Sequence, residues 1–475
     1  MLRMTLVVLT LAAVAGGQYW TGPFLLTGSG DDVNPSACKE FLAGGLTCMV
    51  WQKSDLDCWN IYSSFCNLYN GNGWDQEQRI TRDSALDNVN PAVACLNDWQ
   101  DHPSYWCVWE HREGPVTGSI MASFITFRDS WSPPAVIGRA IHTDGDSAMP
   151  GIITIEGTSA DTVWVAWRNH DTGGTFVSYV FHVGDSWSRE RIAVSAQDLK
   201  HARLGRHGNW SGHRPLLVWE QAGDIWCSIY ESGAWSVPAE VAPSTAADRA
   251  PDVVSGAMGP TYIVWQSDRD GDTAIYITHS DTFSLGQRAC DTSGAGRNWS
   301  PAGADIVFTT RDYLYCIVAW VTDRNGNSDI YTGAGAQDVY VDLDSADDRS
   351  PVVTCMDNLY GSQMAWVLWQ SNRGRDWDIY GSFVCNSGME ENRKPQASGS
   401  KLGATVVRGV LRLTPASSLK LQASSYLVNE AGRKVMDLMP GPNDVRRLAP
   451  GIYFVRRAYG VGREASAITK VVVAR

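Results

Sequence analysis

The sequence predicts an all-β protein, a seven-bladed β-propeller followed by a small C-terminal β-sandwich. An apolar run ending in Trp, a polar turn and a second apolar-aromatic run recur seven times, about 50 residues apart, as in propeller blades. All 21 Trp and all 11 Cys precede residue 395, so the last part is a different domain. The predicted boundaries are a signal peptide over 1–17, the propeller over 18–392, a linker over 393–402 and the sandwich over 403–475.

The first residues are typical of an export signal. Arg3 precedes an apolar run from Leu6 to Val14, and Ala13-Val14-Ala15 supplies the small residues that a signal peptidase accepts. The run is too short to span a bilayer, and no later stretch is long and apolar enough to do so. We therefore expect a mature chain without a transmembrane helix, secreted or held at the outer cell surface. The alternative for this segment is a buried helix.

Each repeat is expected to contain four strands. Asp, Asn and Gly separate its two main runs, as in a β-hairpin. A further apolar stretch, usually opened by Pro, precedes the Trp, and a later strand, often opened by Trp, follows the hairpin. The repeated Trp residues, expected to pack between neighbouring sheets, are Trp51, Trp109, Trp167, Trp219, Trp265, Trp320 and Trp369.

The seventh repeat lacks its last strand, because the chain becomes polar soon after Tyr380. The segment 20–27 has the form of the fourth strand at 131–137. We therefore expect the N-terminal strand to complete the last blade, which closes the ring and leaves no open sheet edge.

Two segments carry a family resemblance. Val264-Trp265-Gln266-Ser267-Asp268-Arg269-Asp270-Gly271-Asp272, with Ile275-Tyr276, is similar to the TolB-type (WD-like) propeller repeat. Val367-Leu368-Trp369-Gln370-Ser371-Asn372-Arg373, with Asp378-Ile379-Tyr380, is similar to it as well. The resemblance implies a propeller fold and assigns no activity, because propellers host many functions.

The C-terminal part differs in charge and in pattern. Residues 401–475 contain 13 Lys and Arg but 4 Asp and Glu, although the whole chain has a net charge of −12. Short apolar runs separated by turns predict a small β-sandwich. The tail resembles the C-terminal sorting domain of type IX (Por) secretion substrates, which implies export across a Gram-negative outer membrane with the secretion machinery as a partner. The motif residues are Gly432, Arg433, Pro450, Gly451, Tyr453 and Phe454. The alternative is an ordinary accessory sandwich.

The cysteines show no CxxC pair and no zinc spacing. In an exported chain, 11 cysteines are expected to form disulfides with one thiol left over. Two pairs are local, Cys38 with Cys48 and Cys95 with Cys107. The alternative is that several are buried thiols.

Two clusters are candidate ligand sites. Histidines recur every six residues among arginines and one Trp, which suits a metal or anion site or, alternatively, a solvated loop. Its residues are His201, Arg206, His207, Trp210 and His213, with Arg203 and Arg214 interleaved. Asp268, Asp270 and Asp272 alternate and could hold Ca²⁺, although the twelfth-position Glu of an EF-hand is missing and a plain hairpin turn is the alternative. No other cofactor is predicted.

Catalytic signals are sparse. Glu110 and Glu220, each directly after a repeated Trp, could form a carboxylate pair for glycoside hydrolysis. GxSxG, P-loop and GxGxxG motifs are missing, so an enzyme is not favoured. Irregularly placed Trp residues are further ligand candidates, with core packing as the alternative: Trp59, Trp99, Trp106, Trp210, Trp226, Trp299 and Trp377.

The acidic balance argues against nucleic acid as a partner. The favoured function is therefore a secreted or surface-displayed propeller that binds a glycan, a peptide or another protein. Two alternatives stay open, a secreted hydrolase of polysaccharide or peptide and a structural surface-layer scaffold.

Overall fold

The computed structural model describes most of the propeller and the strands of the tail. Between 20 and 387 it omits 29, 40–41, 44–45, 56, 68–72, 83–84, 97–102, 127–128, 158–159, 210–211, 255–260, 280–282, 284–285, 291–295, 308–313, 334–337, 343, 358–361 and 375. In the tail it describes 405–407, 410–413, 425–429, 434–438, 441–449, 451–458 and 466–473. The expected signal peptide (1–17) and linker (393–402) lie outside the described residues.

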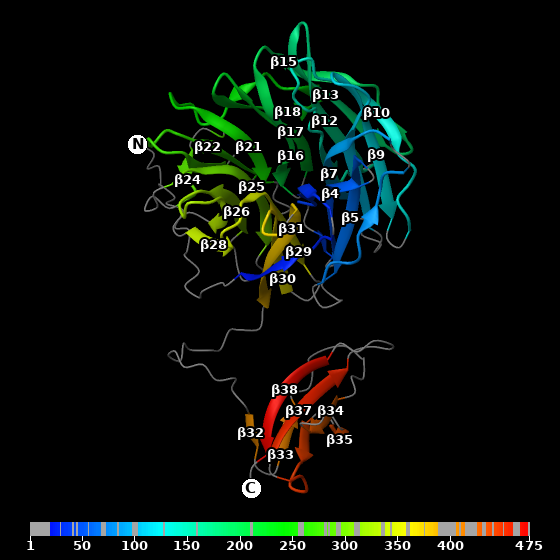
Figure 1. Cartoon of the computed structure of the whole chain (residues 1–475), viewed down its shortest axis with the longest axis vertical. Coiled ribbons are helices and arrows are strands. Elements are labelled where there is room, and N and C mark those ends of the chain that lie inside the picture. The colour runs from blue at the N-terminus through cyan, green and yellow to red at the C-terminus, as the bar shows by residue number, and fades with distance from the viewer. Residues whose placement is uncertain are drawn as a thin grey trace, which may run out of the picture. The chain divides into compact units, whose positions relative to one another are not determined.

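The described part of the chain is all-β and contains no helix long and apolar enough to cross a membrane. Residues 1–389 and 390–475 form two compact units. In the first unit, seven antiparallel sheets are arranged radially, and the chain passes around the ring from one to the next (Figure 1). The seven-bladed propeller is thereby confirmed.

Each blade is given from its innermost strand outward. Blade 1 contains β2 (Asp32–Ala37), β4 (Leu46–Asp55), β5 (Cys58–Asn67) and β6 (Gln78–Arg79). Blade 2 contains β7 (Asn88–Leu96), β8 (Ser104–Arg112), β9 (Thr117–Thr126) and β10 (Ala135–Ile141). Blade 3 contains β11 (Gly151–Ile155), β12 (Thr162–Asp171), β13 (Gly174–Val183), β14 (Ser186–Trp187) and β15 (Arg191–Ala196).

The next three blades repeat this order. Blade 4 contains β16 (Leu199–Asn209), β17 (Gly212–Gln221), β18 (Asp224–Glu231), β19 (Ala234–Trp235) and β20 (Ala239–Glu240). Blade 5 contains β21 (Asp248–Val254), β22 (Tyr262–Ser267), β23 (Ala274–His279) and β24 (Gln287–Arg288). Blade 6 contains β25 (Asn298–Val307), β26 (Leu314–Thr322), β27 (Asp329–Gly333) and β28 (Asp338–Asp342).

The seventh blade is built from both ends of the propeller chain. Its strands are β29 (Asp348–Asp357), β30 (Ser362–Ser371), β31 (Asp378–Ser387) and β1 (Thr21–Leu25), with β3 (Leu42–Ala43) parallel to β29. β1 runs antiparallel to β31, with Phe24 opposite Gly381 and Leu25 opposite Tyr380. The N-terminal strand thus closes the ring, as its resemblance to 131–137 predicted.

The repeated Trp residues form the core between the blades. All seven are fully buried in the structure. Trp51 of blade 1 packs in one cluster with Leu368 of blade 7, and Trp265 of blade 5 packs in one cluster with Trp320 of blade 6. Each sheet therefore buries its apolar face against the next sheet, as expected for large aromatic side chains between radial sheets.

In blades 5 to 7, the polar turn of the repeat supplies an Arg that ties three strands together. Arg373 lies 4.1 Å from the ring centre of Tyr380 on the next strand. Its Nη2 also donates to Asp348, 3.2 Å away, at the start of the innermost strand. Arg269 and Arg324 stack on Tyr276 and Tyr331 in the same way. The Ser/Thr-Asp/Asn-Arg turn therefore stabilises the blade through a cation–π contact and a charged hydrogen bond.

The expected local disulfides are not formed in the structure. Cys48 and Cys107 are buried thiols, and burial raises the pKa of both. Together with Cys38 and Cys95 they belong to one apolar cluster between blades 1 and 2. Cys95 faces Tyr105 rather than Cys107 across the two strands, which explains why that pair does not meet. The two predicted disulfide pairings are therefore wrong, and the alternative of buried thiols holds for Cys48 and Cys107.

The described strands of the tail unit form two sheets. The larger has the strand order β32 (Thr405–Val407), β38 (Ser466–Val473), β37 (Gly451–Ala458), β34 (Ser425–Asn429) and β35 (Lys434–Leu438). The smaller pairs β33 (Val410–Leu413) with β36 (Gly441–Asp444). Leu427, Leu438, Val445 and Tyr453 form a buried core. Packing of the two sheets as a sandwich stays a prediction.

Candidate functional site in the central channel

Every blade has one left-handed residue, with φ between 47° and 53°, two positions from the start of its innermost strand. In six blades a Pro follows this residue, as the sequence pattern suggested, and blade 4 has Ala202 instead. Six of the seven strands shift register here, as at a β-bulge. The left-handed residues are Asn34, Asn90, Met149, His201, Ala250, Ser300 and Ser350.

These turns are held by the preceding blade. The side chain directly after a repeated Trp accepts a hydrogen bond from a backbone N–H at or beside the left-handed residue of the next blade. The pairs are Gln370 with Asn34 (2.9 Å), Gln52 with Asn90 (3.0 Å), Glu110 with Ala148 (3.0 Å), Glu220 with Ala250 (3.2 Å) and Gln266 with Ser300 (3.3 Å). Between blades 3 and 4 the direction reverses, and Arg168 Nε donates to the carbonyl of Leu199 at 2.9 Å. We call these contacts the inter-blade hydrogen bonds.

Glu110 and Glu220, the candidate hydrolytic pair, belong to this set. Glu110 is fully buried, and its Oε1 lies 3.2 Å from Arg112 Nε and 3.3 Å from His142 Nε2. Glu220 lies 2.8 Å from His201 Nδ1. Burial alone would raise the pKa of Glu220, but the hydrogen bonds from His201 and Ala250 lower it. The two carboxylates thus hold separate blade junctions, and neither lines the cavity described next.

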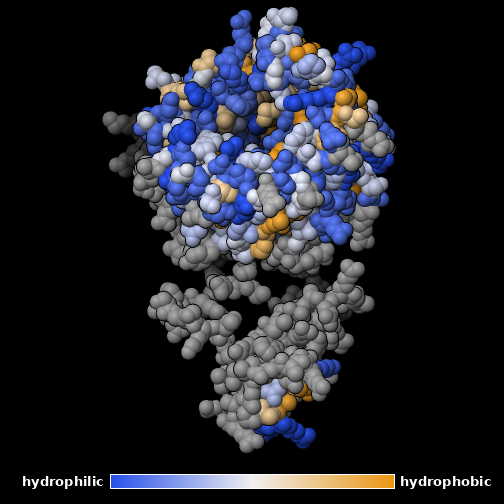
Figure 2. Space-filling model, in the orientation of Figure 1, coloured by the Kyte–Doolittle hydropathy of each residue, from blue (hydrophilic) through white to orange (hydrophobic). Residues whose placement is uncertain are grey.

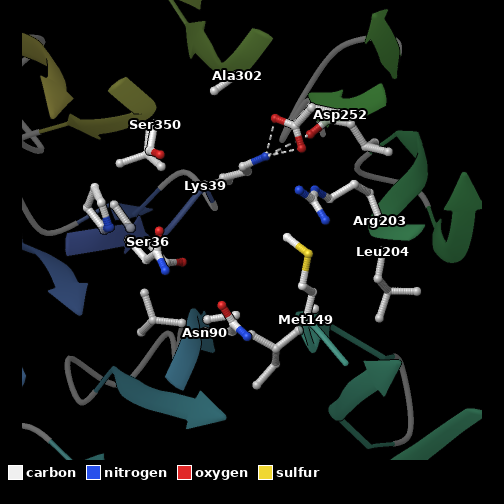
Figure 3. Close-up of a pocket in the computed structure, with 18 of the residues that line it drawn as sticks. Ser36, Lys39, Asn90, Met149, Arg203, Leu204, Asp252, Ala302 and Ser350 are labelled. Atoms are coloured by element: carbon white, nitrogen blue, oxygen red, sulfur yellow. Dashed lines mark hydrogen bonds and ion pairs between the residues drawn. The ribbon is translucent and has the colours of Figure 1, made fainter. Parts of the chain in front are cut away.

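A cavity of about 440 Å³ lies where the seven innermost strands converge (Figure 3). Most of its wall is the repeated Pro and small or apolar side chains such as Ala92, Ile152 and Val352. The visible face of the propeller around it is mostly hydrophilic, with small scattered apolar patches (Figure 2). The cavity therefore combines the concave form and the partly apolar wall of a small-ligand site.

Charged groups enter the cavity from three blades. Lys39, just after β2, places Nζ 2.6 Å from Oδ1 and 2.5 Å from Oδ2 of Asp252 on β21. This ion pair joins blade 1 to blade 5 across the channel. Arg203 of β16 points into the same space, and its Nη1 donates to the carbonyl of Ala202 at 3.1 Å. Burial lowers the pKa of Arg203, against the opposing effect of Asp252.

The predicted histidine cluster is only partly brought together. His201 lines the cavity beside Glu220. Arg206 and His207 are buried further along β16, and His213 lies on β17 opposite Gly208. Trp210 lies outside the described residues. Of the five predicted residues, His201 therefore belongs to the channel, while Arg206 and His207 do not line it.

Sequence reasoning missed Lys39 and Asp252 and named Arg203 only as a neighbour. One column of the repeat carries the signal, namely the second residue after each left-handed residue. It contains Ser36, Ala92, Gly151, Arg203, Asp252, Ala302 and Val352. Only blades 4 and 5 place a charge there, so an alignment of the repeats on this column would have identified Arg203 and Asp252, whereas Lys39 lies outside the column.

The predicted calcium site is occupied by protein contacts in the structure. Arg288 Nη1 lies 3.1 Å from both Asp270 and Asp272, and the hydroxyl of Tyr276 donates to Asp270. Asp268 accepts the backbone N–H of Ala247 at 2.8 Å. Among the described residues, no group of three or more His, Cys, Asp or Glu side chains is arranged to hold a metal. These carboxylates stabilise a hairpin turn, and calcium binding there stays a prediction.

The irregular Trp residues that the structure describes are in protein contacts. Trp106 is almost fully buried and stacks on Phe124, with 4.9 Å between ring centres. Trp299 and Trp377 each lie within 5.5 Å of an Arg guanidinium. Trp99 and Trp210 lie outside the described residues. None of the described members of this set, which also includes Trp59 and Trp226, lines the channel cavity.

The predicted sorting motif is described in part. Gly451 begins β37, and Tyr453 is buried with its hydroxyl donating to the carbonyl of Ala449 at 2.8 Å. Phe454 lies opposite Val428 and Lys470 in the sheet. Gly432, Arg433 and Pro450 lie outside the described residues.

No protein-family model matches the sequence, and no curated protein matches it. Among solved structures, an ulvan lyase described as a new polysaccharide lyase family aligns with TM-score 0.47 and 12% identity, covering 76% of this chain and 96% of that one. Penicillium chrysogenum α-L-arabinanase aligns with TM-score 0.43 and 11% identity, covering 77% and 98%.

Trypanosoma rangeli sialidase aligns with TM-score 0.38 and 10% identity, covering 74% of this chain. The chain spans only 55% of that sialidase. All these TM-scores and identities are low, so the assignment of a seven-bladed propeller rests on the strand pairing itself, and these similarities assign no function.

Proposed function

We propose that the protein is a secreted or cell-surface binding protein whose ligand, a glycan in our preferred version, occupies the central channel of the propeller. The channel cavity carries the proposal. It is walled by all seven blades and contains the Lys39–Asp252 pair and the guanidinium of Arg203. Convergent polar groups in a partly apolar concavity are the general mark of a ligand site.

Binding is favoured over hydrolysis because of the positions of the carboxylates. Glycoside hydrolysis needs two carboxyl groups that flank one bond. Glu110 and Glu220 are tied to backbone amides in different blade junctions. Asp252 is the one acidic side chain among the described residues of the cavity wall, and Lys39 donates to both of its oxygens. Secretion is proposed from the N-terminal segment and the tail motif.

A channel-blocking variant tests this function. The full chain would first be screened on a glycan array, with a peptide array beside it. Ser36 lines the cavity (Figure 3), so Ser36→Phe should weaken binding of the selected ligand at least about tenfold. Ser130→Phe, an exposed change between β9 and β10, is the matched control and should leave binding unchanged.

Melting curves of both variants verify that the fold is kept. Equal affinity of wild type and a folded Ser36→Phe variant would refute a channel site. Release of reducing sugar from the bound glycan by wild type would instead favour the hydrolase alternative.

A further inference from the structure

We propose that the channel takes an acidic sugar, and that Arg203 and Lys39 hold the carboxylate of a uronate unit. The proposal rests on the proposed function and adds the chemical class of the ligand. The charged side chains of the cavity wall support it. Among the residues that the structure describes, the cavity wall carries Lys39 and Arg203 as permanent cations and Asp252 as the one acidic side chain. His201 is paired separately with Glu220.

Within the described part of the wall, the one carboxylate is hydrogen-bonded to Lys39, whereas no direct hydrogen bond is shown between it and Arg203. Both oxygens of Asp252 lie within 2.6 Å of Lys39 Nζ, and Oδ2 also accepts the backbone N–H of Gly303 at 3.3 Å. A guanidinium has five N–H donors in a planar fork that fits a carboxylate through two parallel bonds. Within the described residues, the hydrogen bond shown for Arg203 goes to its neighbour's carbonyl. The fork is therefore open toward the cavity.

The geometry leaves room for a second carboxylate. Lys39 and Arg203 reach toward the same space beside Asp252 from different walls (Figure 3). The side chain of Lys39 is 31% exposed, so a ligand can reach its ammonium without breaking the bond to Asp252. A ligand carboxylate between the two cations would give two positive and two negative charges in the cavity. Such pairing offsets the cost of holding charges away from bulk water.

The rest of the wall fits a sugar. Ser36, Ser300 and Ser350 line the cavity together with the repeated Pro residues. Hydroxyls both donate and accept hydrogen bonds, as sugar hydroxyls require, and proline rings can pack against the C–H face of a pyranose. A wall of this kind offers many hydroxyl contacts and one anion-binding corner.

The test compares ligands that differ in one charge. Isothermal titration of the full chain would use digalacturonate and diglucuronate, their methyl esters, digalactose and an acidic tetrapeptide. The better uronate should bind at least about tenfold more tightly than its own methyl ester, which has nearly the same shape without the charge. This comparison uses wild-type protein and does not depend on the folding of any variant.

Two variants test which cation binds the carboxylate of the ligand. Arg203→Gln should reduce the ratio of acid affinity to ester affinity about tenfold or more, because it removes the guanidinium fork. Lys39→Gln should reduce this ratio less, because the fork remains, although Asp252 then repels the ligand carboxylate. Arg189→Gln, an exposed change between β14 and β15, is the control and should leave the ratio unchanged. Melting curves confirm that each variant is folded.

The outcomes separate this proposal from the function on which it rests. Equal binding of acid and ester, or failure of both uronates to bind, would overturn the uronate site. Binding of the acidic tetrapeptide alone would overturn the sugar. A neutral glycan whose binding is lost in Ser36→Phe would keep the channel function while the uronate proposal fails.

Discussion

The side chain that follows each repeated Trp has a role that is invisible in one blade taken alone. In five blades it is Gln or Glu, and its oxygen accepts a backbone N–H of the next blade. Gln and Glu can both make this contact, because it requires only an oxygen that accepts a hydrogen bond. This explains why Glu110 and Glu220 look like catalytic carboxylates in the sequence and are structural in the fold.

The first prediction tests such a bond at Gln52. Its Oε1 accepts from Asn90 N and Asn34 Nδ2, both at 3.0 Å. Gln52→Ala leaves two donors without their acceptor and should lower the free energy of unfolding by about 1–3 kcal/mol. Gln52→Glu keeps the acceptor, as in blades 2 and 4, and should cost much less. Urea unfolding measures both, and equal losses for the two variants would contradict the role given to this bond.

The second prediction concerns pH. Burial raises the pKa of Asp32 to about 7, against the opposing effects of Lys53 and Trp51. The folded protein therefore binds a proton at Asp32 that the unfolded chain releases between about pH 4 and 7. Stability contributed by this group is present at low pH and is lost as pH rises toward 7.

Asp32→Asn should remove that dependence while keeping the acceptor for Trp51 Nε1, as Asn88 does for Trp109 in blade 2. Relative to wild type, the variant should be more stable at pH 8 than at pH 5 in urea unfolding. Asp75→Asn, at an exposed site, is the control. A parallel shift at both pH values would show that Asp32 does not titrate as described.

At the scale of the element, the sequence predicts strands better than it predicts the channel. The seven Trp repeats and the resemblance of 20–27 to 131–137 follow from local pattern, so blade number and closure could be predicted. The Lys39–Asp252 pair joins residues of blades 1 and 5, and no local pattern connects them. The packing of Trp106 against Phe124 was likewise not predictable, because it depends on how neighbouring strands are aligned.

The third prediction concerns β1. The five residues of β1 are exposed, and Leu26, directly after β1, donates its N–H to the carbonyl of Ile379 at 2.9 Å. Phe24 of β1 also stacks on Phe383, with 5.9 Å between the ring centres. Deletion of residues 20–27 should lower the free energy of unfolding by roughly 3 kcal/mol or more and expose the edge of β31 to association. Urea unfolding and size-exclusion chromatography measure the two effects. Addition of a peptide spanning 18–28 should restore stability, and an unchanged deletion variant would refute closure by β1.

At the scale of the whole molecule, the chain divides into two units with different tasks. The propeller unit ends near residue 389 and the tail unit has its own buried core. All Trp and Cys lie in the first unit, while the basic excess lies in the second. This division was visible in composition, because a core built on Trp and one built on Leu, Val and Tyr need different sequences.

The fourth prediction concerns the tail. Truncation after Ser398 should leave the melting temperature of the propeller and its ligand affinity unchanged, because each unit has its own core. In a host with type IX secretion, the full chain should reach the medium or the surface and the truncated chain should stay in the periplasm. Equal export of the full and truncated chains would show that the tail is not a sorting signal. A truncated propeller that is less stable would favour the scaffold alternative.

The seam between blades 6 and 7 shows what ring closure means for cooperativity. A linear array of repeats can fray from its ends, but a closed ring has no terminal repeat, so releasing any blade requires two junctions to break together. Blade 6 has Val321 at the position where five blades have the polar acceptor and blade 3 has Arg168. Trp20, beside β1, donates there to Thr332 at 3.1 Å and packs against Val321 in the same cluster. The N-terminal segment that closes the ring thus also stabilises a junction that lacks the usual hydrogen bond. We therefore expect the seven blades to unfold as a single unit.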